Sequence, residues 1–107
     1  MESPLWLLKL DIDSGMPVPT VGRVAAILRR AGYRLLWWRQ DTSASGRGLH
    51  IALRVTPKCR TAMEQVALQA ALGSDPFRES CNVLRVRALP KLSPYWRARW
   101  NVLYKGR

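Results

Sequence analysis

The sequence predicts an α+β domain with the element order β-α-β-β-α-β, the ferredoxin-like arrangement in which both helices cover one face of an antiparallel sheet. Two patterns predict it. Several apolar segments have the period-two alternation of strands, and the segments between them have a helical period and are bounded by capping residues or glycine. The length of 107 residues and the hydrophobic content of 48% suit a single domain, residues 1–107, with one core.

The first strand is expected over residues 5–13, followed by a loop and a helix. Successive side chains of a strand point to opposite faces, so one face is apolar and the other polar. The expected core face holds Trp6, Leu8, Leu10 and Ile12. The expected open face holds Lys9, Asp11 and Asp13. Thr20 can cap a helix that runs to about Arg30, with an apolar stripe that comprises Val21, Val24, Ala25 and Leu28.

A β-hairpin is expected next. Residues 33–39 predict the second strand and residues 49–55 the third, because the polar, glycine-bearing segment 40–48 joins them directly. The odd positions of the third strand are aliphatic, so His50 and Arg54 face the same way as the acidic pair. Trp37 and Trp38 are interpreted as core and sheet-edge packing, with a platform for stacking bases as the alternative.

A second helix and a fourth strand complete the expected fold. The helix is predicted over about residues 60–72, ended by Gly73, with a stripe of Met63, Val66, Ala67 and Ala70. Residues 82–89 alternate and predict the fourth strand, which adds Arg85 and Arg87 to the open face of an RRM-like sheet. Residues 100–104 can form an extra C-terminal strand at the sheet edge.

The charge of the chain predicts a polyanionic partner. Eighteen Lys and Arg residues against seven Asp and Glu residues give a formal net charge of +11, which favours nucleic acid. The alternative is a basic surface without a specific role, or a piece of a larger basic assembly. Cys59 and Cys81 have no metal-site spacing and are expected as reduced thiols. No signal peptide or membrane span is recognised, so a cytoplasmic location and no membrane partner are expected.

The placement of two of the seven acids predicts a metal site. Asp11 and Asp13 lie roughly 6.6 Å apart along one face of a strand, where two unpaired like charges cost stability. A pair of divalent cations would offset that cost. The alternative is neutralisation by arginines across the sheet, for which Arg54, Arg85 and Arg87 are the candidates.

These motifs together resemble the catalytic module of the archaeo-eukaryotic primase superfamily, the primase-polymerases. Residues 10–13 (LDID) resemble its acidic first motif, and residues 45–50 (SGRGLH) resemble its second, which holds the nucleoside triphosphate. Ser74-Asp75, followed by residues 82–87 and Lys91, resembles the third motif more loosely. The resemblance spans about residues 5–92, and an additional module that many members carry is missing here.

The resemblance implies a two-metal nucleotidyltransferase that uses Mg²⁺ or Mn²⁺, a dNTP or NTP, and a single-stranded DNA or RNA template. The implied catalytic and metal-binding residues are Asp11, Asp13 and Asp75, with Glu79 as a competitor for the third position. The implied nucleotide-binding residues are Ser45, Gly46, Arg47, Gly48, His50, Arg85 and Lys91. A chain of this length would be a minimal core, an excised piece, or a protein that needs a second subunit.

The basic, aromatic segment 91–107 is a separate indication of single-stranded nucleic acid, because bases stack on aromatic rings and phosphates pair with cations. The expected nucleic-acid-binding residues are Arg87, Trp96, Arg97 and Arg99. Two other functions are considered for the whole domain. One is a non-catalytic RRM-like module that binds single strands, and the other is a rolling-circle-type nuclease, which would need a histidine pair where this chain has one histidine. The plainer interpretations are that His50 is a structural residue, that residues 45–48 are an ordinary hairpin loop, and that Asp75-Pro76 starts a turn after the second helix.

Overall fold

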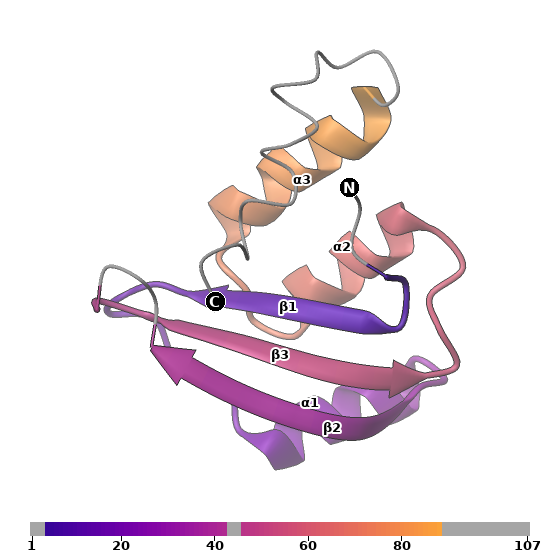
Figure 1. Ribbon diagram of the computed structural model, residues 1–107, viewed down its shortest axis with the longest axis horizontal. Helices are drawn as coiled ribbons and strands as arrows, with labels where there is room; N and C mark the ends of the chain where they lie inside the picture. The colour runs from indigo at the N-terminus through magenta and orange to yellow at the C-terminus, as the bar shows by residue number, and fades with distance from the viewer. Residues whose placement is uncertain (1–3, 43–45, 89–107) are drawn as a thin grey trace.

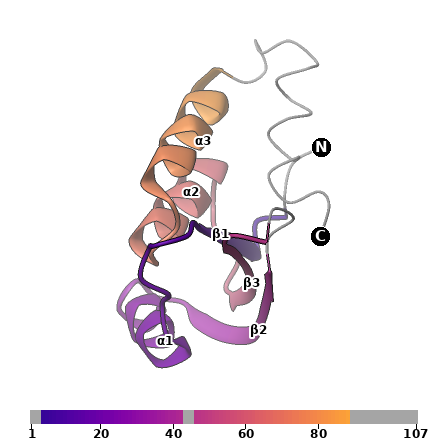
Figure 2. The ribbon, with the colours of Figure 1, turned by 90° about the vertical axis from the view of Figure 1, so that its left-hand side faces the viewer.

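The computed structural model describes residues 4–42 and 46–88, which form a sheet flanked by helices (Figure 1). The elements are β1 Leu7–Ile12, α1 Val21–Arg30, β2 Arg34–Thr42, β3 Leu49–Thr56, α2 Ala62–Ala71 and α3 Pro76–Ala88. Within the described residues the sheet has three antiparallel strands in the order β1-β3-β2. Helices α1 and α2 lie against one face of the sheet, and α3 packs against α2 beside β1 (Figure 2). The α+β class and the antiparallel sheet are confirmed, whereas the full β-α-β-β-α-β order is not found.

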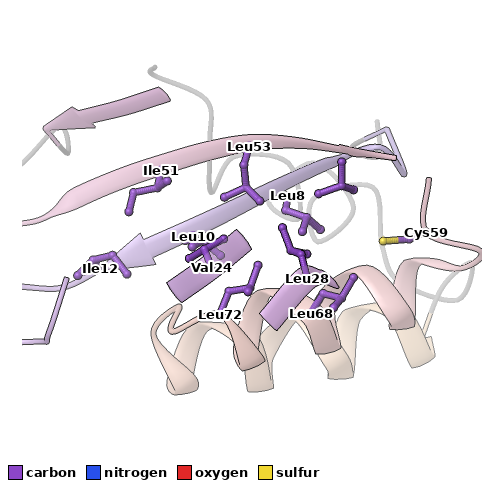
Figure 3. Close-up of a cluster of buried hydrophobic side chains, with 11 residues drawn as sticks. Leu8, Leu10, Ile12, Val24, Leu28, Ile51, Leu53, Cys59, Leu68 and Leu72 are labelled. Atoms are coloured by element: carbon purple, nitrogen blue, oxygen red, sulfur yellow. The ribbon is translucent and has the colours of Figure 1, made fainter. Parts of the chain in front are cut away.

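The period-two patterns of β1 and β3 place the core as the sequence predicts. Leu8, Leu10 and Ile12 of β1 are buried and alternate with half-buried residues. In β3 the buried residues are Ile51, Leu53 and Val55. The core cluster comprises Leu8, Leu10, Ile12, Val24, Leu28, Ile51, Leu53, Val55, Cys59, Leu68 and Leu72, most of them labelled in Figure 3. The opposite face of these strands carries Lys9, Asp11 and His50, with Asp11 directly across from His50.

The predicted first helix is confirmed, with one difference in its buried stripe. The Thr20 hydroxyl accepts a hydrogen bond of 3.1 Å from the backbone N–H of Arg23, as an N-cap does. Val24 and Leu28 face the core, but Val21 in the first turn is 47% exposed. In the described parts of the chain, no helix combines the length and apolarity that a bilayer-spanning segment requires.

A β-bulge decides which tryptophan of β2 faces the core. Leu35 lies opposite Val55 and Trp37 opposite Arg54, so Leu36 is an extra residue in the pairing. Trp38 consequently packs against the core, while Trp37 is 45% exposed on the open face. The interpretation of both tryptophans as packing residues therefore fails for Trp37.

Trp6 also lies on the face opposite to the one predicted. The residue precedes β1, in a turn, so the alternation of the strand does not extend to it. The guanidinium carbon of Arg54 lies 4.5 Å from the centroid of the Trp6 ring, a cation–π contact on the open face. Trp6 is 37% exposed and is not part of the core.

The predicted fourth strand over residues 82–89 is wrong, because residues 76–88 form α3. Asp75 begins this helix: its Oδ1 accepts from the N–H of Phe77 at 3.0 Å, and its carbonyl accepts from the N–H of Glu79 at 3.0 Å. Pro76 occupies the first helical position, where its missing N–H costs nothing. Arg87 is therefore an exposed residue of a helix and does not extend the open face of the sheet.

Polar side chains of α2 occupy the sheet edge where a fourth strand would pair. Gln65 Nε2 donates to the Leu7 carbonyl at 2.6 Å, and the Lys9 N–H donates to Gln69 Oε1 at 3.0 Å. Both glutamines are buried, so the predicted α2 stripe is wrong at Ala67 and Ala70, which are exposed, and correct at Val66. The predicted stripe contained only apolar residues, whereas the edge of β1 requires hydrogen-bonding groups.

Candidate metal and nucleotide site

Three carboxylates converge at the end of β1. Asp11 is in β1, Asp13 follows the strand, and Asp75 is the N-cap of α3. One oxygen from each carboxylate can be chosen so that all three lie within 4.8 Å of one another. The structure thus brings together the residues that the sequence assigned to the metal, including the remote Asp75.

Backbone hydrogen bonds hold Asp75 beside Asp11. The N–H of Asp75 donates to the Asp11 carbonyl at 2.7 Å, and the N–H of Asp11 donates to the Ser74 hydroxyl at 2.9 Å. One main-chain bond and one bond to a side-chain hydroxyl therefore join residues 74 and 75 to β1, immediately before α3 begins. These contacts hold the backbone of Asp75 beside Asp11 independently of any ligand.

Glu79, the competitor for the third position, has a different role. Its side chain is 2% exposed and accepts hydrogen bonds from Gln69 Nε2 and Asn82 Nδ2, both at 3.0 Å, and from Arg78 Nη1 at 2.9 Å. Arg78 Nη1 also donates to the Ser74 hydroxyl at 3.1 Å and to the Lys9 carbonyl at 3.3 Å. Glu79 is thus the centre of a buried polar network that supports the residues holding Asp75.

The electrostatics of the cluster favour a bound cation. A side-chain hydrogen bond with Asp75, some loss of hydration, and the negative charges of Asp11 and Asp75 raise the pKa of Asp13 above its ordinary value. Like charges so close repel when all are ionised, and a divalent cation would remove that repulsion. Carboxylate oxygens are the donors that Mg²⁺ and Mn²⁺ prefer, so the three residues fit such an ion.

His50 lies beside the carboxylates, on β3. Its Nε2 is 3.3 Å from Asp11 Oδ1, and its side chain is 13% exposed. Arg54, a candidate to neutralise the acidic pair, has its guanidinium over Trp6 instead. Histidine, rather than this arginine, is therefore the basic partner of Asp11.

The glycines of the second motif have structural reasons as well as the implied nucleotide role. Gly46 has a φ of +76°, a conformation that favours glycine. A Cβ at Gly48 would overlap the Ile12 carbonyl oxygen, so the start of β3 passes too close to β1 for a side chain. Arg47 between them is exposed. The loop thus brings main chain close to the end of β1, next to Asp13.

Several predicted residues cannot be placed. Those outside the described residues are Ser45, Lys91, Trp96, Arg97 and Arg99, together with the predicted strand 100–104. The side chain of Arg85 is likewise outside the description, although its backbone belongs to α3. The nucleotide-binding role implied for these residues stays a prediction.

The open face of the sheet also contains a cavity that was not predicted from the sequence. It has a volume of about 660 Å³ and extends from His50 along the strands to Arg54. Its lining is Trp6, Leu7, Lys9, Leu36, Trp37, Arg39, Asp41, His50, Ile51, Ala52 and Arg54. Burial, and then the charge of Arg78, lower the pKa of Lys9 from 10.5 to about 8. The unusual content of tryptophan was the signal that could have indicated this cavity. The exposure of Trp37 itself could not be predicted, because the bulge that causes it depends on strand pairing.

Comparisons of the chain with protein-family models, curated proteins and solved structures find no match. The interpretation of the site is accordingly carried by the carboxylate cluster, His50 and the open-face cavity.

Proposed function

We propose that this protein is a metal-dependent nucleotidyltransferase of primase-polymerase type, which adds nucleotides to a nucleic-acid strand. The observation that carries the proposal is the meeting of Asp11, Asp13 and Asp75 beside His50. The net charge of +11 supports a polyanionic substrate, although the candidate metal site itself is acidic. An acidic cluster on a basic protein is consistent with cations that bind between carboxylates and phosphates.

The metal ligands in this proposal are the carboxylates of Asp11, Asp13 and Asp75. The chemistry that two bound Mg²⁺ or Mn²⁺ ions supply in nucleotidyl transfer is activation of a 3′-hydroxyl and stabilisation of charge on the departing pyrophosphate. His50 would contact the triphosphate, and its partner Asp11 orients the imidazole ring. Main-chain N–H groups of the glycine-bearing loop would approach the same phosphates, since Gly48 lies against the end of β1.

The remaining parts of the proposal concern the substrates. A dNTP or NTP supplies the nucleotide, and single-stranded DNA or RNA is the template. The nucleotide-binding residues implied outside the described region, Ser45 and Lys91, would complete the phosphate contacts. A second subunit or a further module is a proposed partner of this core.

The test is incorporation of labelled dNTPs and NTPs on primed and unprimed single-stranded templates with Mg²⁺ or Mn²⁺. We expect extension by the wild type and at least a hundredfold loss in the Asp11→Ala/Asp13→Ala variant. Glu64→Gln is the control, because it removes an acidic charge away from the cluster, on α2, where Glu64 pairs with Arg60 at the surface. No extension, with equal binding of single strands by the wild type and the double variant, would favour the non-catalytic binding module.

A further inference from the structure

The open-face cavity has the size of a ligand site and an unusual lining. Its volume of about 660 Å³ falls within the range of roughly 300–1,000 Å³ that small-ligand pockets occupy. Trp6, in the turn before β1, and Trp37 of β2 line it from the two outer edges of the sheet, and both rings remain partly exposed. The bulge at Leu36 turns two adjacent apolar side chains of β2 to this face. Such exposed apolar area on a highly charged protein indicates a binding surface.

The cations around these rings favour an anionic aromatic ligand. Arg54 lies over Trp6 and Arg39 lines the opposite side, where it also pairs with Asp41 at 2.8 Å. Lys9 is a third basic residue in the lining. A nucleobase can stack on an indole ring while its phosphate pairs with a neighbouring guanidinium or ammonium group.

His50 links the cavity to the carboxylate cluster. His50 contacts Asp11 and also lines the cavity, and four residues further along β3 is Arg54. Four strand residues span roughly 13 Å, so the tryptophans lie on the same face as the carboxylates but well away from them. A strand whose end reached Asp11 could therefore extend along the sheet to Trp6.

We propose that this cavity is a base-stacking subsite for a single nucleic-acid strand, with Trp6 and Trp37 as the stacking platforms and Arg54 as a phosphate contact. The proposal rests on the proposed function only in its choice of nucleic acid as partner. A single strand is the occupant because bases in a duplex do not present their faces to a protein. This surface lies in the described sheet and is separate from the basic C-terminal segment that the sequence singles out.

The first test uses the wild-type protein and needs no variant. Fluorescence anisotropy compares a labelled oligodeoxythymidylate of about 15 nucleotides with an abasic oligonucleotide of equal length, without divalent cations. The abasic strand keeps the phosphates and loses the stacking faces, so we expect at least tenfold weaker binding. Equal affinities would show binding by charge alone and would overturn the proposal.

The second test locates the subsite. We expect Trp6→Ala and Trp37→Ala each to weaken binding of the oligodeoxythymidylate about tenfold or more. Phe77→Ala is the matched control, since Phe77 is a 78% exposed aromatic on α3, outside the cavity. Circular dichroism checks folding, and Trp37→Phe should recover most of the affinity because it keeps an aromatic face. Unchanged binding by both folded alanine variants would overturn the assignment.

The assay conditions and one further readout separate this proposal from its alternatives. The binding assays contain no divalent cation and measure no extension, so a failure of catalysis would leave the stacking result unaffected. The stacking proposal fails if sedimentation shows that Trp37→Ala dissociates a dimer while oligonucleotide binding is unchanged. That result would assign the apolar face to a second copy of the chain.

Discussion

The buried pair Arg78–Glu79 gives a sharp prediction, because its loss should affect both the stability and the carboxylate cluster. Both side chains are at most 5% exposed, and Arg78 Nη1 lies 2.9 Å from Glu79 Oε2. Glu79→Gln keeps the shape of the side chain but leaves the guanidinium of Arg78 buried without its counter-charge. The same guanidinium donates to Ser74 and to the Lys9 carbonyl, at the point where α3 meets β1.

The expected cost is large on the scale of a small domain. Breaking one half of a buried ion pair typically costs about 3–5 kcal/mol, against a total stability of about 5–15 kcal/mol. Glu64→Gln is the control, because Arg60 and Glu64 form an i,i+4 pair at 3.4 Å in which Arg60 is largely exposed. Such surface pairs contribute about 0.3–0.5 kcal/mol.

Urea unfolding followed by circular dichroism measures both variants. We expect Glu79→Gln to lower the free energy of unfolding by about 3 kcal/mol and Glu64→Gln by less than 1 kcal/mol. Equal, small losses would refute the conclusion that the network of Glu79 holds α3 against β1. A fully folded Glu79→Gln that binds Mn²⁺ as the wild type does would further show that Asp75 is positioned without this network.

Two other predictions concern the strand pairing and the cavity. Gly48→Ala should lower the free energy of unfolding by about 1–3 kcal/mol, since its Cβ would overlap the Ile12 carbonyl. Gly22→Ala in α1 is the control, because its Cβ meets no atom within 4 Å and the change should be neutral or slightly stabilising. Equal effects of the two variants on the urea midpoint would contradict this. Lys9 has a pKa of about 8 in the folded protein, below its ordinary value of 10.5. Between pH 8 and 10.5 the unfolded chain therefore binds more protons than the folded protein. The free energy of unfolding should consequently rise with pH over this range. Urea midpoints at pH 8 and 10 should show a larger rise for the wild type than for Lys9→Met, and identical changes would refute the assignment to Lys9.

The strand and helix patterns near the N-terminus were sufficient to predict half of the fold. In β1 and β3, each buried aliphatic residue alternates with a polar or half-buried one, and only one register places both apolar sets in the core. Thr20 is a capping residue directly before a helical period, so the start of α1 follows from local chemistry. The meeting of Asp11 with His50 also follows, because both patterns point to the same face.

The C-terminal half was mispredicted for a physical reason. Leu84, Val86 and Ala88 alternate as the residues of a strand do, whereas Val83 and Val86 have the i, i+3 spacing of one helix face, so the period alone does not decide. The deciding signal was Asp75-Pro76, an N-cap followed by proline in the first turn. The buried face of α3 also contains the charged pair Arg78–Glu79, so the helix lacks the apolar stripe by which a buried helix face is predicted from sequence.

The open-face cavity could not be predicted from local patterns. The bulge at Leu36 appears only when β2 pairs with β3, and it reverses the direction of Trp37 relative to a regular strand. Trp6 lies before the first paired residue, so its orientation comes from the turn and from Arg54. Both tryptophans reach the open face through tertiary contacts.

The most direct test of the central claim is the binding of Mn²⁺ observed in ¹H–¹⁵N spectra of the protein. Paramagnetic Mn²⁺ broadens nearby amide signals, so we predict selective loss of the signals of Ile12, Asp13 and Asp75 at low ion concentration. The effect should vanish in Asp13→Asn and persist in Glu64→Gln, because only the first removes a ligand from the three-carboxylate cluster. Broadening that is absent, that centres elsewhere, or that is identical in Asp13→Asn would contradict the proposed metal site.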